Sequence, residues 1–300
     1  MFSRRRVLIA VVALLAAVAV GLRPAASAAQ SAAGRNFLWK VQSGAAVLYL
    51  AGSVHALTAA NYPLNPAYQR AFDASGALVE EIDLAEADPL SGGLSILAKG
   101  MYTDGRTFNS VVSRQTASRV AARLAGTPFA LDLIQPMKPW MVMMLIETLE
   151  LQAGGFDANL GLDKYFFDKA TAAKKTVIGL ETAASQIDRF DKMTEAQQEE
   201  LLVNALAEND AERANLKSLI SAWQRGDAPA MEKLMLEGFQ GNTAAYTSLI
   251  TERNRNWMPQ LEACFRRPSP CFVVVGAAHV VGPDGLLVML RSKGYRIEQQ

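Results

Sequence analysis

The two histidines of this 300-residue chain are its strongest candidates for chemistry, because both occur in the same local setting. His55 closes the tetrad Gly52-Ser53-Val54-His55, and His279 closes Gly276-Ala277-Ala278-His279, each directly after an apolar run. Such runs are typical of buried strands, and a glycine at the strand end allows a sharp turn or a close approach. If the two strands are parallel neighbours, both imidazoles lie beyond the carboxyl ends of the strands, where open α/β sheets bind ligands.

Acidic residues end two further predicted strands. Glu81 and Asp83 are two positions apart near the end of the first strand, so they are expected on one face of the sheet, with Glu80 on the other. Glu181 ends the second strand. With the two histidines, these carboxylates form a set that suits a divalent ion such as manganese, cobalt or zinc. A bound ion would lower the pKa of its water and supply a hydroxide nucleophile. The alternative for each acid is structural, and Glu181 in particular could cap the helix after it.

The remaining pattern predicts an α/β fold with a mixed central sheet, flanking helices and a large helical insertion or cap. Strands are expected at 37–41, 46–51, 77–83, 175–181, 271–275 and 295–298, the first two as a hairpin around Ser43-Gly44. Helices are expected at 64–74, 161–172 and 285–293, and helical insertions at roughly 90–155 and 185–262. Thr194 and Gln197 have the spacing of a capping box.

Residues 1–28 have the features of a secretory signal peptide. Three arginines, Arg4 to Arg6, precede an apolar run over 7–22, and Ala26-Ser27-Ala28 resembles a cleavage site. We therefore expect a mature domain over 29–300 that is exported to the periplasm or the extracellular space. The apolar run is short for a membrane span of about 20 residues, so no stable span is expected after cleavage. An uncleaved anchor is the less favoured alternative, and the general and twin-arginine export routes both remain open.

Charge and cysteine content narrow the class of protein further. Removing the signal peptide takes away four arginines and no acidic residue, so the formal net charge falls from +1 to −3. This charge argues against a nucleic-acid partner. Cys264 and Cys271 are the two cysteines, and export to an oxidising compartment favours a disulfide between them over a metal pair.

Motifs spread over nearly the whole mature chain resemble those of a known family. They are the two Gly-x-x-His tetrads, Leu78 to Asp83, Gly161-Leu162-Asp163, Gly179 to Thr182 with Gln186, Arg253-Asn254 with Trp257, and Gly294-Tyr295. In this order they are similar to those of the TraB/GumN (TraB/PrgY/GumN) family, whose relatives include the Tiki metalloproteases and the pheromone-shutdown proteins. The resemblance implies an α/β fold similar to that of erythromycin-esterase-like and heme-binding ChaN-like proteins, and metal-dependent peptidase activity as in the Tiki branch. Residue by residue, it matches His55 and His279 to the motif histidines, Glu81 and Glu181 to acidic positions, and Arg253 and Asn254 to an Arg-Asn pair.

These observations together predict an exported metal-dependent hydrolase whose activated water attacks a peptide or ester carbonyl, with a peptide or protein as the favoured substrate. His55, His279 and one or both of Glu81 and Glu181 are the expected ligands, and a carboxylate not used by the metal is the expected general base. Arg253, followed by Asn254, is expected to stabilise the oxyanion, although without the family resemblance its helix would pass for an ordinary charged face.

Two alternatives use the same cleft. A non-catalytic protein that binds heme, a metal or a peptide would need the histidines but not the acids. A metal-free hydrolase would use a histidine as general base. The sequence does not indicate the oligomeric state.

Overall fold

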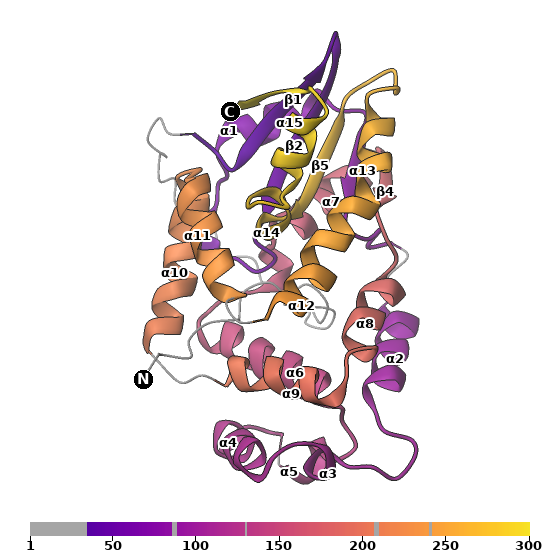
Figure 1. Ribbon diagram of the computed structural model, residues 1–300. Coiled ribbons are helices and arrows are strands. Elements are labelled where there is room, and N and C mark those ends of the chain that lie inside the picture. Colours follow the sequence, from indigo (N-terminus) through magenta and orange to yellow (C-terminus); the bar gives the residue numbers. More distant parts are fainter. Residues whose placement is uncertain (1–34, 86–88, 130, 207–209, 240–241) are drawn as a thin grey trace.

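The computed structural model of the chain describes residues 35–85, 89–129, 131–206, 210–239 and 242–300, which form an α/β fold around one sheet (Figure 1). The predicted signal peptide, 1–28, lies outside the described residues. Within the described ranges, no helix combines the length and the apolar character needed to cross a bilayer.

The sheet has six strands in the order β4-β3-β5-β2-β1-β6. Their bounds are β1 (Leu38–Ser43), β2 (Ala46–Ser53), β3 (Ala77–Glu80), β4 (Thr176–Gly179), β5 (Cys271–Gly276) and β6 (Arg296–Gln299). Strands β2, β5, β3 and β4 pair in parallel, whereas β1 is antiparallel to both of its neighbours. The predicted mixed sheet is therefore confirmed. Strands β1 and β2 form the predicted hairpin, and Gly44 supplies the positive φ of +58° in its turn.

Register brings the two Gly-x-x-His tetrads to the same edge of the sheet. Ser53, the last residue of β2, lies opposite Gly276, the last residue of β5. Because the two strands are parallel, the chain leaves both of them in the same direction. Strand β3, on the other side of β5, ends at Glu80 and is shorter than predicted, so Glu81 lies just beyond the strand at this edge.

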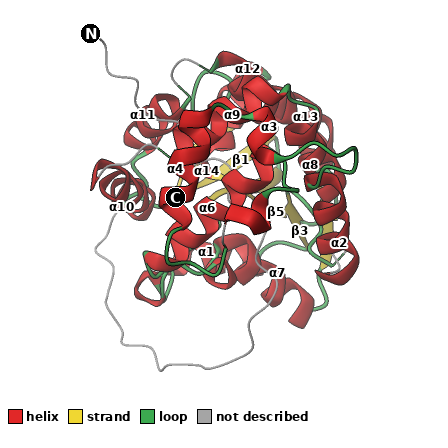
Figure 2. Cartoon of the chain, turned by 90° about the horizontal axis from the view of Figure 1, so that it is seen from below, coloured by secondary structure: helices red, strands yellow, loops and turns green. Residues whose placement is uncertain are grey.

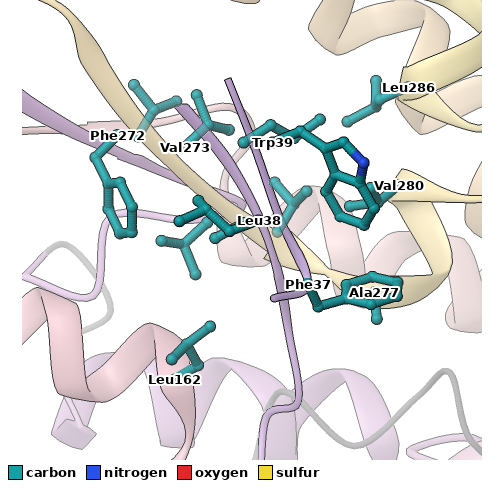
Figure 3. Packing of buried hydrophobic residues seen from close by; sticks show 14 of the residues in the cluster. Phe37, Leu38, Trp39, Leu162, Phe272, Val273, Ala277, Val280 and Leu286 are labelled. Atoms are coloured by element: carbon teal, nitrogen blue, oxygen red, sulfur yellow. The ribbon is translucent and has the colours of Figure 1, made fainter. Parts of the chain in front are cut away.

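One hydrophobic core surrounds the sheet. Phe37, Leu38 and Trp39 at the start of the hairpin belong to the same buried cluster as Phe272 and Val273 of β5, and all five are almost inaccessible to solvent (Figure 3). Helices from the early, middle and late parts of the chain add to this core: α1 (Pro66–Asp73), α7 (Leu162–Ala172), α10 (Asp210–Gln224), α11 (Ala228–Gly238), α13 (Glu252–Cys264), α14 (Ala277–Val280) and α15 (Leu286–Ser292).

A second hydrophobic core is built by helices alone. These helices are α2 (Pro89–Gly100), α3 (Phe108–Val111), α4 (Arg114–Leu124), α5 (Leu131–Ile134), α6 (Pro139–Ala153), α8 (Ala183–Asp191), α9 (Glu195–Ala205) and α12 (Thr243–Tyr246). They come mainly from the two stretches expected to be helical insertions, and the capping box predicted for Thr194 and Gln197 begins α9. In Figure 1 they lie below the sheet, and from below they cover much of it (Figure 2).

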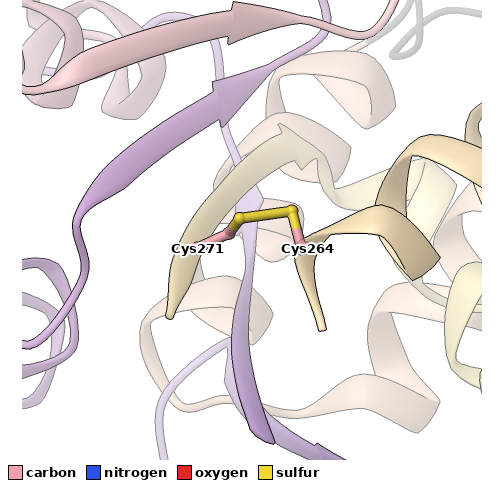
Figure 4. The surroundings of a disulfide bond; sticks show 2 residues. All are labelled: Cys264 and Cys271. Atoms are coloured by element: carbon pink, nitrogen blue, oxygen red, sulfur yellow. A yellow bond between two sulfur atoms is a disulfide. The ribbon is translucent and has the colours of Figure 1, made fainter. Parts of the chain in front are cut away.

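Short helical turns complete the chain. Two 3-10 turns span Ala59–Asn61 and Ala158–Leu160, and a π-helical turn over Thr247–Thr251 leads into α13. A disulfide joins Cys264 at the end of α13 to Cys271 at the start of β5, with a Cα–Cα distance of 5.8 Å, as predicted (Figure 4). It therefore fastens the helix that carries Arg253 to the strand that leads to His279.

Candidate functional site

His55 lies two residues beyond β2, and its ring is held from behind by Asp163. Its Nδ1 is 3.1 Å from Oδ1 of Asp163, and the hydroxyl of Ser53 donates to the same oxygen over 2.7 Å. Asp163 is in the first turn of α7. With Nδ1 bonded to a carboxylate, which only accepts, this nitrogen carries the proton. The Nε2 atom is therefore the one that faces the site.

His279 follows β5 within the short helix α14 and is 3% exposed. Its Nδ1 is 2.8 Å from Oδ1 of Asn254, and its Nε2 is 2.8 Å from Nη1 of Arg253. A guanidinium can only donate, so Nε2 accepts and Nδ1 donates to Asn254. The amide nitrogen of Asn254 in turn donates to the carbonyl oxygens of His279 and Asp284.

Glu81 lies between the two imidazoles. Its Oε1 accepts from the backbone N–H of Gly276 over 2.7 Å and is 3.8 Å from Nε2 of His55 and 3.9 Å from Nε2 of His279. Its Oε2 accepts from Arg253 and, over 3.1 Å, from the side chain of Gln186. One oxygen of a single carboxylate therefore faces both motif histidines.

Arg253 is the cation at the centre of the cluster. It forms a buried ion pair with Glu81, donates from Nε to Glu181 over 2.7 Å, and donates to the carbonyl of Leu249 in the π-helical turn over 3.2 Å. Its guanidinium also lies 4.7 Å from the ring centroid of Trp257, one turn further along α13. These contacts explain why a charged side chain that is 7% exposed is tolerated here.

Glu181 completes the acidic pair and is held by the same partners. Its Oε1 accepts from Arg253 and, over 2.9 Å, from Gln186. Backbone bonds from Leu180 and Glu181 to the carbonyls of Glu80 and Glu81 place the two segments side by side beyond the strand ends. Glu81 and Glu181 are thus brought together by Arg253 and Gln186, but only Glu81 faces the histidines.

The two histidines have opposite electrostatic environments. Burial alone lowers the pKa of His55, but the charge and hydrogen bond of Asp163, with help from Glu81, outweigh burial and raise the pKa to about 9. Burial and the positive charge of Arg253 hold the pKa of His279 well below its ordinary value. At neutral pH, His55 is therefore cationic and His279 is neutral.

The carboxylate between them stays ionised. Burial favours the neutral acid, yet Arg253 and the N–H of Gly276 hold the pKa of Glu81 below its ordinary value. The same ion pairs raise the pKa of Arg253 against the effect of its burial.

The glycines of the two tetrads allow close approach rather than unusual backbone angles. A Cβ at Gly276 would lie 2.9 Å from Nε2 of His55 and 3.1 Å from Oε1 of Glu81. A Cβ at Gly52 would lie 2.3 Å from the ring of Phe37. The missing side chain at Gly276 therefore leaves space beside the two atoms best suited to bind a ligand.

The donor set fits a divalent ion in chemistry, with one condition. Two imidazole nitrogens and a carboxylate oxygen are ligands of zinc, cobalt and manganese, and each ring is held through Nδ1, as metal-bound histidines are. Within the described residues, no group of three or more His, Cys, Asp or Glu side chains already has a spacing suited to a metal ion. Arg253 occupies Nε2 of His279, so an ion using both histidines would have to replace that hydrogen bond.

The structure thus brings together six of the seven residues singled out from the sequence. These are His55, Glu81, Glu181, Arg253, Asn254 and His279. Asp83 does not belong to this group: β3 ends before it, and its carboxylate instead accepts from the backbone N–H of Ala85 over 2.9 Å.

Sequence reasoning missed the groups that hold the site residues from behind. Asp163 and Ser53 hold His55, Gln186 bridges the two glutamates, and Trp257 packs against Arg253 and against the ring of His279, 4.5 Å away. All four belong to motifs that suggested the family, Ser53 as part of the first tetrad, but the sequence assigned no role to any of them.

Comparison with known proteins agrees with the motifs. The model of the TraB/PrgY/gumN family matches residues 37–299. Two bacterial proteins, each named "Uncharacterized protein YbaP" and coming from Escherichia coli K12 and Shigella flexneri, are 25% identical to this chain over 243 residues, 81% of the chain and 87% of each relative. No solved structure matches significantly.

Proposed function

Because the chain belongs to the TraB/PrgY/gumN family, we propose that it is an exported metal-dependent hydrolase that cleaves an amide bond in a peptide or protein. The observation that carries the proposal is the convergence of both Gly-x-x-His histidines on Oε1 of Glu81, at 3.8 and 3.9 Å. Two strand-end imidazoles 224 positions apart have no structural need to share one buried carboxylate oxygen.

The ligands we assign are His55, Glu81 and His279. When bound, a divalent ion such as manganese, cobalt or zinc would lower the pKa of a coordinated water and polarise the carbonyl of the substrate. His55 presents Nε2 to this position because Asp163 holds Nδ1, and Glu81 presents Oε1 because Gly276 and Arg253 hold the carboxylate. For both histidines, Nε2 must be free of a proton and of Arg253 to serve as a ligand.

Arg253, Glu181 and Asn254 lie beside the proposed metal position and have different proposed roles. Arg253, released from Nε2 of His279, would keep its contact with Glu181 and stabilise the negative charge that develops on the carbonyl oxygen. We assign Glu181 as the general base because it contacts Arg253 and Gln186 rather than the histidines. Asn254 holds His279 in the tautomer that leaves Nε2 available.

Elemental analysis of the purified mature chain tests the proposal, together with digestion of a peptide library in chelator and after addition of manganese, cobalt or zinc. The wild type should carry about one ion per chain and should lose cleavage in chelator. The His55→Ala/His279→Ala variant should carry no ion and cleave no peptide, while circular dichroism shows that it stays folded. Asp168→Asn, an exposed change on α7, is the matched control and should behave like the wild type.

Two variants separate a hydrolase from a protein that only binds. Glu181→Gln removes the proposed base and should abolish cleavage while metal content stays near that of the wild type. Glu81→Gln removes a ligand and should reduce both. The proposal is wrong if the double-histidine variant cleaves peptides as fast as the wild type. It is also wrong if the wild type carries no metal and keeps full activity in chelator.

A further inference from the structure

The two motif histidines are alike in sequence, but different groups hold them from behind. His279 donates from Nδ1 to a neutral amide, Asn254, whereas His55 faces a carboxylate, Asp163. We propose that Asp163, itself fixed by Ser53, is the positioning residue that aims Nε2 of His55 at Glu81 and makes His55 the stronger electron donor of the two histidines. This inference rests on the proposed function for its metal-binding consequence, but not for its geometry.

Backbone contacts fix Asp163 in register with His55. The N–H of Leu162 donates to the carbonyl of Val54 over 3.2 Å, tying the start of α7 to the segment just before the histidine. Next to it, a Cβ at Gly161 would lie 2.3 Å from the carbonyl oxygen of His55, so only glycine allows this approach. Each residue of the Gly161-Leu162-Asp163 motif therefore has a physical role. Gly161 allows the backbone to approach His55, Leu162 binds the backbone of Val54, and Asp163 supplies the carboxylate.

The carboxylate oxygen of Asp163 has two donors. Oδ1 accepts from Ser53 over 2.7 Å and from Nδ1 of His55 over 3.1 Å. Ser53 is 2% exposed, whereas the side chain of Asp163 is 22% exposed, so the hydroxyl holds the carboxylate from the buried side. With Nδ1 engaged, rotation of the ring is restricted and Nε2 stays on the side of Glu81.

A carboxylate behind a ligand histidine has a measurable effect. It fixes the tautomer, raises the basicity of the ligand nitrogen, and typically changes metal affinity by about 10- to 100-fold when removed. The amide of Asn254 can fix a tautomer but supplies no negative charge. Asp163 therefore has a chemical role in the site that Asn254 does not duplicate.

Nitrogen NMR on histidine-labelled protein in chelator tests the positioning role without any metal. The chain has two histidines, so His55→Gln assigns both signals. Each Nδ1-bound proton should be protected from exchange with water in the wild type. Asp163→Ala should remove the His55 signal and leave the His279 signal, which serves as the internal control. Asp168→Ala, on the same helix, should leave both.

Titration calorimetry with Mn²⁺ tests the consequence. Asp163→Ala should weaken binding by about 10- to 100-fold. Asp163→Asn, which is isosteric and serves if the alanine variant does not fold, should keep the His55 proton signal and weaken binding less. An unchanged His55 signal in Asp163→Ala, or unchanged affinity beside a wild type that binds, would overturn the inference. If the wild type binds no ion, the proposed function fails while the NMR result still decides the positioning role.

Discussion

Removing the charge of Arg253 should destabilise the metal-free protein more than any other single charge deletion in the site. The guanidinium side chain is 8% exposed, and the carboxylates of Glu81 and Glu181 are each 9% exposed, so solvent screens these ion pairs weakly. The variant Arg253→Met removes the cation that two buried carboxylates share, leaving His55 at 3.8 Å from Glu81 and the amide of Gln186 at Glu181. Breaking a buried pair from one side costs about 3–5 kcal/mol, and loss of a shared partner places this case toward the upper end. For a chain of this size, the melting temperature should fall by about 6–20 °C.

Urea unfolding at pH 7 in chelator, followed by circular dichroism, measures this loss. Arg189→Met is the matched control, because Arg189 also pairs with a glutamate, Glu252, but that side chain is 53% exposed. An exposed pair contributes about 1 kcal/mol or less. If Arg253→Met loses no more free energy of unfolding than Arg189→Met, then Arg253 is not the counter-ion of the acidic pair and the reasoning about the site charge is wrong.

Three further predictions concern pH and the disulfide. Folding lowers the pKa of Glu81, so the ionised carboxylate stabilises the folded protein above about pH 4.5, and this stabilisation is lost as the pH falls below that value. The urea midpoints of the wild type and of Glu81→Gln should therefore converge on acidification below about pH 4.5. The pKa of His55 is raised from 6.5 to about 9, so its stabilisation is complete below pH 6.5 and is lost as the pH rises through about 9; a constant difference from His55→Gln across that range would contradict this. Replacing both Cys264 and Cys271 by serine, which opens a loop with a sequence separation of 7, should lower the free energy of unfolding by about 2–3 kcal/mol in thermal denaturation.

The parts of the site that could be predicted are those encoded by local pattern. An apolar run followed by Gly-x-x-His marks a strand end, and its occurrence at both histidines of the chain suggested a common edge. The pairing of β2 with β5 confirms that edge. Glu81 could be predicted because it follows an apolar run that marks the end of a strand. The alternation of side chains along a strand also placed Asp83 on the same face. That inference failed because β3 stops at Glu80 and the chain bends before Asp83.

The parts that could not be predicted depend on tertiary contacts. Asp163 is 108 positions from His55 along the chain and reaches it only because α7 packs across the sheet. Arg253 lies in a helix whose sequence is typical of a charged surface, and its burial follows from Glu81 and Glu181 arriving from two other segments. No periodicity within one helix contains that information. Only the family resemblance singled it out.

Ala278, inside the second tetrad, packs against both hydrophobic cores. The short helix that carries His279 therefore lies at the boundary between the sheet core and the all-helical core. Helix α14 itself belongs to the sheet core, and Arg253 and Asn254 of α13, in the same core, hold the ring of His279. Both motif histidines therefore stay with the sheet, while Ala278, the neighbour of His279, packs against the all-helical core. A bulkier side chain at position 278 would press the two cores apart directly beside the imidazole.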